Sequence, residues 1–239
     1  MGNNVVVDYK AVNVYFSGYA SLRAMTTRPY HHGNLRTALL EAAESTLRER
    51  GAQALSLREL AREVGVSHGA PRRHFGDRQA LLDALARDGF ERLGAELREA
   101  AAAAGEEFEP RLRALAAAYI RFATEDAALL ELMFAGKHRE PTGELADAAE
   151  RAFAVMLELI EQGQREGALD SGDQKGVGLV LFATIQGIAA LVNGGIVEPE
   201  EVSGVVADAT ERFLRGGRGR TRAGGGGRKA RPRSAASVA

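Results

Sequence analysis

The sequence has 239 residues, of which 45% are hydrophobic and 26% are charged, and it contains no cysteine. This composition can fill a buried core, and it excludes disulfides, thiolate zinc sites and cysteine nucleophiles. The longest apolar stretch, residues 177–192, is shorter than the about 18–20 residues of a membrane span. Because no secretory leader opens the chain either, we expect a cytoplasmic protein that has no contact with a membrane.

The net charge of −1 conceals an uneven distribution of charged residues. Residues 26–78 carry nine basic and six acidic side chains, and residues 216–239 carry seven basic and no acidic ones. Residues 79–215, in contrast, have a net charge of −12. A basic head and tail on an acidic body are typical of a protein whose head meets a polyanion.

Residues 1–25 do not share the pattern of the rest of the chain. Their valine-rich runs predict extended backbone, whereas the later segments predict helix. Met25 stands directly before a basic segment, so one interpretation makes Met25 the native start of the protein. The alternative is a disordered or added extension. In both cases we predict that residues 1–25 lie outside the fold.

The first predicted helix covers residues 34–50, where alanines and leucines recur at intervals of three and four and Gly51 follows as a helix-ending residue. Ser56 and Glu59 have the spacing of a capping box, in which each side chain bonds the backbone amide of the other residue. A second helix is therefore predicted over residues 57–64.

Gly65 is predicted to form the next turn, since glycine adopts positive φ at no steric cost. Ser67 is then placed to cap a third helix over residues 68–75, and Asp77 is placed to begin a long helix that ends at Gly105. Further helices are predicted over residues 110–124, 126–135, 142–166, 173–195 and 199–214. No strand pattern follows residue 25, so we expect an all-α fold with a disordered basic tail at 216–239.

Residues 56–75 have the anatomy of a helix-turn-helix, with a short helix, a glycine turn and a second helix that has an exposed basic face. Arginine side chains suit guanine edges and phosphates, and small residues at the helix tip allow close approach to bases in the major groove. Arg28 could follow the DNA backbone or enter the minor groove. The pattern predicts a DNA-binding domain over residues 26–80.

The run ALSLRELAREVGVS at 54–67, followed by RHF at 73–75 and DRQALL at 77–82, resembles the DNA-binding domain of the TetR family. The opening YHHGNLR at 30–36 is similar to a subgroup that also has an all-helical effector domain. The resemblance implies a homodimer that binds a pseudo-palindromic operator on double-stranded DNA. Such proteins are usually repressors that a small-molecule effector releases.

The resemblance also implies roles for individual residues in DNA binding. Ser56 and Arg58 would meet phosphates, Ser67 to Ala70 and Arg73 would face bases, and His74 and Arg78 would hold the DNA backbone. Pro71-Arg72 departs from the family pattern, which often has a tyrosine there, although Arg72 can still bind phosphate. The complete predicted set is Arg28, Ser56, Arg58, Ser67, His68, Gly69, Ala70, Arg72, Arg73, His74 and Arg78.

Residues 81–215 are predicted to form a helical domain that binds the effector and dimerises. The helix around 179–192 has almost no polar face and is expected to be buried all round, and the resemblance places the last two helices in a four-helix dimer interface. The pocket candidates are Phe90, Tyr119, Phe122, Met133, Phe134, Phe153, Met156, Phe182 and Gln186. Each could instead simply pack the core, and Gln186 could bond backbone or the other subunit. The shortage of basic residues favours an apolar or cationic effector over an anionic one.

An enzyme is not expected, because the sequence has no nucleophile elbow, phosphate loop, His-Glu-x-x-His pair or dinucleotide fingerprint. His31 and His32 have no acidic or cysteine partner nearby, which favours a basic arm over a metal site. We therefore expect no cofactor and no metal. The alternative function is an architectural DNA-binding protein without an effector, whose basic tail adds sequence-independent phosphate contacts. That tail could equally be an inert extension.

Overall fold

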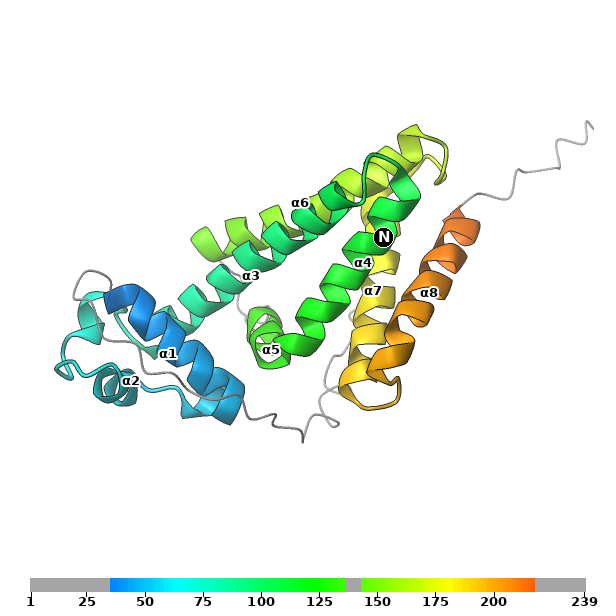
Figure 1. The fold of residues 1–239 in the computed structure, drawn as a ribbon. Helices are drawn as coiled ribbons and strands as arrows, with labels where there is room; N and C mark the ends of the chain where they lie inside the picture. The colour runs from blue at the N-terminus through cyan, green and yellow to red at the C-terminus, as the bar shows by residue number, and fades with distance from the viewer. Residues whose placement is uncertain (1–34, 136–142, 218–239) are drawn as a thin grey trace, which may run out of the picture.

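The computed structural model describes residues 35–135 and 143–217, and in these ranges every regular element is helical, as the sequence predicted (Figure 1). The N-terminal extension, Arg28, the His31-His32 pair and the tail beyond residue 217 lie outside the described residues. A small head comes first in the chain and a larger body follows. The head contains α1 (Leu35–Arg50), η2 (Ala52–Ala54), α2 (Leu57–Glu63) and η3 (Pro71–Arg73), where η marks a short 3-10 helix.

The body is a bundle of longer helices. These are α3 (Arg78–Ala103), α4 (Phe108–Glu125), α5 (Ala127–Ala135), α6 (Glu144–Arg165), α7 (Gln174–Asn193) and α8 (Val202–Gly217), the last preceded by η5 (Pro199–Glu201). The helices predicted for this part of the chain agree with these bounds to within a few residues. Hydrophobic periodicity and helix-capping residues were therefore sufficient to locate the elements of the body.

Helix α3 joins the head to the body. It begins where the Asp77 carboxylate accepts a hydrogen bond from the Ala80 backbone N–H at 2.8 Å, as an N-cap residue does. The helix then packs against α1 of the head and against α4, α5 and α6 of the body. Two glycines allow these close contacts, since a Cβ atom at Gly89 would lie 2.7 Å from the Met133 sulfur and one at Gly94 would lie 3.1 Å from the Ala152 Cα.

One continuous hydrophobic core extends through the head and the body. It includes Leu39 and Leu60 in the head, Leu85 on α3, and Ile120 and Ile160 in the body, each 3% exposed or less. A shared core makes it costly to move the head without disturbing α3, because packed interiors tolerate little change in volume.

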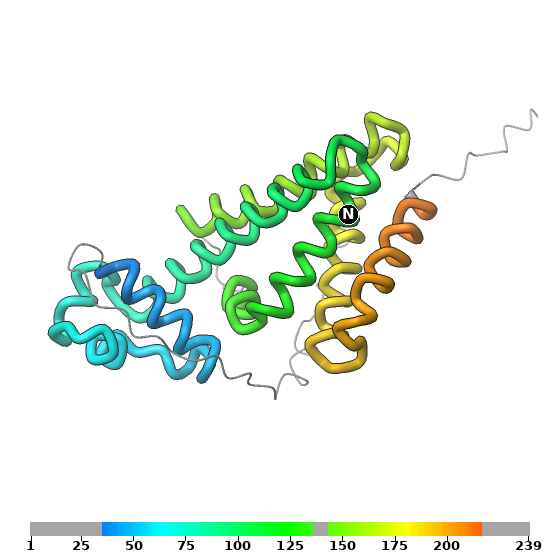
Figure 2. The backbone as a smooth tube through the Cα atoms, in the orientation of Figure 1, coloured from blue at the N-terminus to red at the C-terminus, as the bar shows by residue number. Residues whose placement is uncertain are grey.

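Helices α7 and α8 lie side by side at one edge of the body (Figure 2). The expectation that the apolar helix 179–192 is buried all round is wrong for the single chain, because a helix at the edge of a bundle buries only one face. Leu179 is 64% exposed, Val180 58% and Leu191 41%. Helix α7 is 20 residues long and contains an 18-residue window with a mean hydropathy of 1.8, so by length and composition it could span a membrane, contrary to the estimate from the apolar stretch alone. Its inner face, however, packs against α4, α6 and α8.

Candidate nucleic-acid interface and effector site

The head has the predicted helix followed by a glycine turn. Helix α2 ends in a Schellman arrangement, in which the Val66 N–H bonds the Ala61 carbonyl at 2.9 Å and the Gly65 N–H bonds the Arg62 carbonyl at 3.2 Å. Gly65 has a φ of 76°, a left-handed conformation that glycine adopts without strain. The turn therefore forms for the reason that the sequence indicated.

The predicted third helix over residues 68–75 is wrong in its extent. Only η3 is helical there, and the chain around it forms separate turns, such as the Ala70 N–H bonded to the Ser67 carbonyl at 2.9 Å. Pro71 explains the difference, because it has no N–H and its ring removes the backbone hydrogen bond that would extend a helix begun at Ser67. The second element of the motif is thus one tight turn instead of a helix of two turns.

The predicted capping box is also absent. Ser56 is the N-cap residue of α2 and has extended backbone, but its side chain makes no cap hydrogen bond. The carbonyl of Ser56 nevertheless accepts the first helical bond from the Leu60 N–H at 3.0 Å. The helix begins where the pattern indicated, and the Ser56 hydroxyl is available for another partner.

Several of the predicted DNA-binding side chains lie together on the outside of the head. Pro71 and Phe75 are buried beneath the turn, and the Arg36 guanidinium stacks 5.4 Å above the Phe75 ring, which fixes the turn on α1. The exposed members of the predicted set are Arg58, Ser67, His68, Gly69, Arg72, Arg73 and His74, and the half-buried members are Ser56, Ala70 and Arg78. The buried apolar pair thus holds the turn, and the polar members of the predicted set remain accessible from solvent.

Arg78 differs from the rest of this set because its guanidinium already has protein partners. Its Nε donates to the Leu55 carbonyl at 2.9 Å, and a second nitrogen donates to the Ala52 carbonyl. These bonds fasten the start of α3 to η2. Arg78 therefore has a structural role in the head, to which any contact with DNA would be added.

In the body, the predicted effector residues form an aromatic cluster, which we define as Phe90, Tyr119, Phe134, Phe153 and Phe182. Ring centroids within it lie 5.3–6.3 Å apart, mostly edge to face. Phe90 and Tyr119 are 2% exposed, whereas Phe134, Phe153 and Phe182 are half-buried. Phe122, Met133 and Met156 belong to the same core. Gln186 is half-buried, and its side chain forms no hydrogen bond with any described residue.

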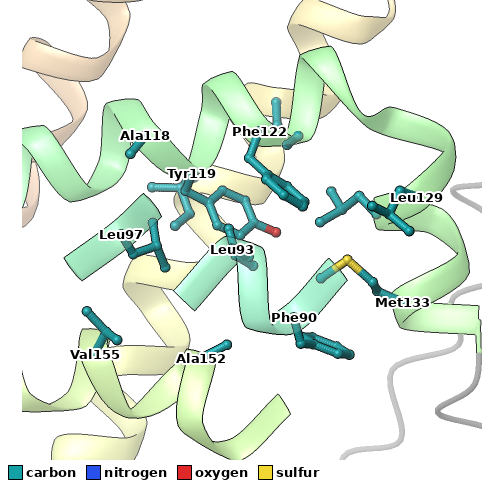
Figure 3. Close-up of a cluster of buried hydrophobic side chains, with 14 of the residues drawn as sticks. Phe90, Leu93, Leu97, Ala118, Tyr119, Phe122, Leu129, Met133, Ala152 and Val155 are labelled. Atoms are coloured by element: carbon teal, nitrogen blue, oxygen red, sulfur yellow. The ribbon is translucent and has the colours of Figure 1, made fainter. Parts of the chain in front are cut away.

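The Tyr119 hydroxyl is a polar group without a hydrogen-bond partner next to this aromatic cluster. It is buried and makes no hydrogen bond with the described residues. Figure 3 shows the hydroxyl among Leu93, Phe122 and Met133, all apolar. Burial raises the pKa of this phenol far above its ordinary value, so the group stays neutral.

A cluster of charged side chains that no sequence pattern predicted links the head to the body. Arg92 on α3 pairs with Glu44 of α1 at 3.0 Å and with Asp126, which follows α4, at 2.8 Å. Arg48 of α1 also reaches Asp126, at 3.3 Å, and the Arg92 guanidinium stacks 5.1 Å above Phe122. Burial alone would lower the pKa of Arg92, but the hydrogen bond to Glu44 and the charges of Glu44 and Asp126 raise it overall.

The signal for this charged cluster was weak. Arg92 stands next to Leu93 at the border of the apolar face of α3, and Asp126 was interpreted only as the start of α5. A second polar residue that was missed is Gln162, 9% exposed, which donates to the Glu106 carbonyl at 2.7 Å and to the Glu166 carboxylate at 2.7 Å. No pattern in the sequence pairs Arg92 with Glu44 or Gln162 with Glu106, which lie 48 and 56 positions apart.

An open pocket of about 480 Å³ lies at the end of the bundle, away from the aromatic cluster. It is lined by Glu106, Glu107, Phe108, Glu109, Glu166, Ala168 and Leu214. None of the predicted effector residues belongs to it. Within the described residues, no group of three His, Asp or Glu side chains is placed to hold a metal ion.

Comparisons with known proteins agree with this architecture. Residues 39–85 match the family profile of bacterial regulatory proteins, tetR family, and residues 112–215 match the tetracyclin repressor-like C-terminal domain. A solved structure of a protein of unknown function from Rhodococcus sp. RHA1 is 45% identical, with a TM-score of 0.72, and the alignment covers 80% of this chain and 98% of that one.

Two more distant structures share the fold. The TetR-family transcriptional regulator PfmR from Thermus thermophilus is 20% identical over 74% of this chain and 97% of its own, with a TM-score of 0.59. A bacterial regulatory protein of the tetR family from Rhodococcus RHA1 is 21% identical over 77% and 96%, with a TM-score of 0.59. The search of curated proteins gave no match.

Proposed function

Because the chain belongs to the TetR family of bacterial regulatory proteins, we propose that it is a homodimeric repressor that binds an operator sequence and is released by a small-molecule effector. The observation that carries the proposal is the group of exposed Arg58, Arg72, Arg73 and His74 around the turn of the head. It is a regulator and not an enzyme, and it acts in the cytoplasm, where bacterial DNA lies.

The geometry of the head suggests which of its residues contact bases and which contact phosphates. At the exposed tip, the small residues Ser67 and Gly69 let the backbone approach base edges, and His68 adds a side chain that can hydrogen-bond them. Arg72 and Arg73 follow directly and can reach either phosphates or guanine. Since η3 is only one turn long, fewer side chains reach the bases than on a full recognition helix. We therefore expect phosphate contacts to supply most of the affinity and to make binding strongly dependent on salt.

The exposed face of α7 supports the homodimer. Leu179, Val180 and Leu191 present a large apolar surface of the kind that marks protein interfaces. Pairing α7 and α8 of two subunits would cover it and would present two heads to two half-sites, which in an operator lie about 34–36 Å apart.

Dimerisation is tested by placing a charge on this face. Val180→Asp is expected to shift the protein from dimer to monomer in light scattering after size-exclusion chromatography, because an unpaired charge cannot be buried in the interface. Ala95→Asp, at an exposed position on α3, is the matched control and should remain dimeric. A Val180→Asp protein that is folded and still dimeric would reject α7 as the interface.

The charged cluster of Arg92, Asp126, Glu44 and Arg48 offers a way for an effector bound in the body to change the position of the head. These ion pairs connect α1 of the head to α3 and to the end of α4. A ligand that moves α4 within the body would change these distances and with them the orientation of the head. A coupling free energy of about 1–3 kcal/mol is typical of allosteric proteins and is within reach of such a cluster.

The decisive experiment is selection of genomic fragments from the source organism with the full chain at physiological salt. We expect a short inverted repeat to be recovered with the natural protein and lost with Arg73→Ala. Arg113→Ala, which removes an exposed arginine on α4 of the body, is the matched control and should recover the same repeat. Recovery of random fragments, unaffected by Arg73→Ala, would reject a sequence-specific regulator.

The second candidate, an architectural DNA-binding protein without an effector, is favoured by one feature, the seven basic residues of the tail at 216–239. If the tail provides the main phosphate contacts, then deleting residues 218–239 will flatten the dependence of log K on log salt by about 0.9 for each phosphate that the tail neutralised. Random DNA would also bind almost as well as any promoter. An unchanged slope after the deletion would leave the head as the DNA-binding surface.

A further inference from the structure

Tyr119 is a buried polar group for which the described protein supplies no partner. The other polar side chains in the core are satisfied, as in Thr210, whose hydroxyl donates to the Val206 and Ala207 carbonyls, both at 2.9 Å. The other buried side-chain atoms without a hydrogen bond in the described ranges are nitrogens of Arg92 and Arg111, and both guanidinium groups have further nitrogens with partners. A buried hydroxyl without a partner is unfavourable, so such groups call for an explanation.

The aromatic cluster connects this hydroxyl to the surface of the body. The Phe182 ring lies 5.8 Å from the Tyr119 ring, 5.8 Å from the Phe134 ring and 5.3 Å from the Phe153 ring. Tyr119 is buried, whereas the other three rings are partly exposed. Phe182 therefore links the buried Tyr119 ring to two partly exposed rings, and a rotation of the Phe182 side chain would loosen the packing between Tyr119 and the surface.

The surroundings also define the kind of molecule that fits. The side chains around the Tyr119 hydroxyl in Figure 3, including Leu93, Phe122 and Met133, carry no charge. A charged ligand would lose its hydration there without gaining a counter-charge. An aromatic ligand would instead gain edge-to-face contacts with the surrounding rings. Met133 has a flexible side chain and lies against Gly89, so it can be displaced at low cost.

We propose that Tyr119 is the polar anchor of the effector site, and that its hydroxyl donates a hydrogen bond to the carbonyl oxygen of a neutral aromatic molecule held between Phe182 and Met133. This inference rests on the proposed function and names the ligand class for it. The ligand satisfies the unpartnered hydroxyl, and its ring replaces contacts within the aromatic cluster. The hydroxyl therefore destabilises the core of the free protein, and in the complex it supplies the hydrogen bond on which the affinity depends.

The chain offers a direct spectroscopic test, because it has no tryptophan and its other four tyrosines lie at positions 9, 15, 19 and 30. Replacing these four with phenylalanine in the full chain leaves Tyr119 as the only tyrosine. Labelling that tyrosine with ¹³C at Cζ then gives a single NMR resonance that is sensitive to hydrogen bonding of its hydroxyl. Acetophenone is the probe, ethylbenzene the matched compound without an acceptor, and benzoate the anionic compound.

We expect acetophenone to shift the Tyr119 resonance and to bind more tightly than ethylbenzene and benzoate. In Tyr119→Phe, the affinity for acetophenone measured by calorimetry should fall about tenfold, the worth of one hydrogen bond. The affinity for ethylbenzene should not fall. An unmoved resonance, an equal loss for both probes, or tighter binding of benzoate would each overturn the proposal.

The same four-phenylalanine protein is assayed for operator binding without any probe. If it binds DNA and acetophenone leaves Tyr119 unaffected, only the proposed anchor fails. If neither this protein nor the natural chain selects an operator, then the proposed function fails, whatever the result with the probes.

Discussion

Replacing Tyr119 with phenylalanine removes one oxygen atom from the core and is expected to stabilise the protein. Most large-to-small substitutions at sites 2% exposed have the opposite effect. Here, however, the deleted group is a hydroxyl without a hydrogen-bond partner among the described residues, and the ring that contacts Phe182 remains. The sign of the effect therefore tests whether the hydroxyl is truly unsatisfied.

The magnitude follows from the cost of burying such a group. A buried donor without a partner costs about 1–3 kcal/mol. Removing the oxygen eliminates this cost, but it also loses the van der Waals contacts that the atom makes, which offsets part of the gain. We expect a net gain of about 1 kcal/mol in the free energy of unfolding. For a domain of this size, such a gain raises the melting temperature by roughly 2–4 °C.

The assay is urea unfolding followed by circular dichroism at one fixed protein concentration, since the proposed dimer makes stability depend on concentration. Thr210→Val is the matched control, because the Thr210 hydroxyl is equally buried but donates to two carbonyls. The control should show no gain in stability. If Tyr119→Phe is instead less stable than the natural protein by 1 kcal/mol or more, the hydroxyl has a partner, such as an ordered water, and the reasoning is refuted.

Two further predictions concern charge. Burial raises the pKa of Tyr119 above its unfolded value of about 10, so above pH 10 the unfolded chain loses this proton before the folded protein does, and the free energy of unfolding falls as the pH rises further. Unfolding measured between pH 9 and 11.5 should therefore show a shallower loss for Tyr119→Phe, and equal losses would contradict this origin. Arg92→Met removes a guanidinium that is 36% exposed and that pairs with Glu44 at 3.0 Å and with Asp126 at 2.8 Å. The substitution should lower the free energy of unfolding by about 1–2 kcal/mol. Arg113→Met, which breaks one exposed pair with Glu109, should cost less than about 0.5 kcal/mol, and equal costs would show that Arg92 contributes no more than a surface pair.

Most of the fold could be predicted from the sequence, because each helix of the body has an apolar face at helical spacing and a recognisable end. Asp77 shows how local such a signal is, since its bond to the Ala80 N–H needs no other part of the chain. The prediction was wrong where two local signals conflicted. Residues 68–75 have the composition of a recognition helix, but Pro71 removes the backbone donor that such a helix needs, and the turn η3 forms instead.

The sites could be predicted only in part, and for a different reason. The outward orientation of Arg58 follows from the helical periodicity of α2, whereas Arg73 is exposed although the helix predicted around it does not form. The sequence also indicated that large aromatic residues collect in the body. It could not show that the Tyr119 hydroxyl is left without a partner, because that depends on which side chains α3, α5 and α7 bring around it. Nor could it pair Arg92 with Glu44, which are 48 positions apart.

Helix α4 places the candidate effector anchor and the link to the head on one rigid element. Tyr119, Phe122 and Asp126 follow one another at intervals of three and four residues, so they lie along one side of the helix and its C-terminal end. Phe122 contacts the Arg92 guanidinium, and Asp126 pairs with both Arg92 and Arg48. A ligand that binds the Tyr119 hydroxyl must therefore change either the position of α4 or the packing beside it, and the ion pairs at its end are the first contacts with α1 to respond. Because these pairs are only partly buried, they can be rearranged by the binding energy of a small molecule.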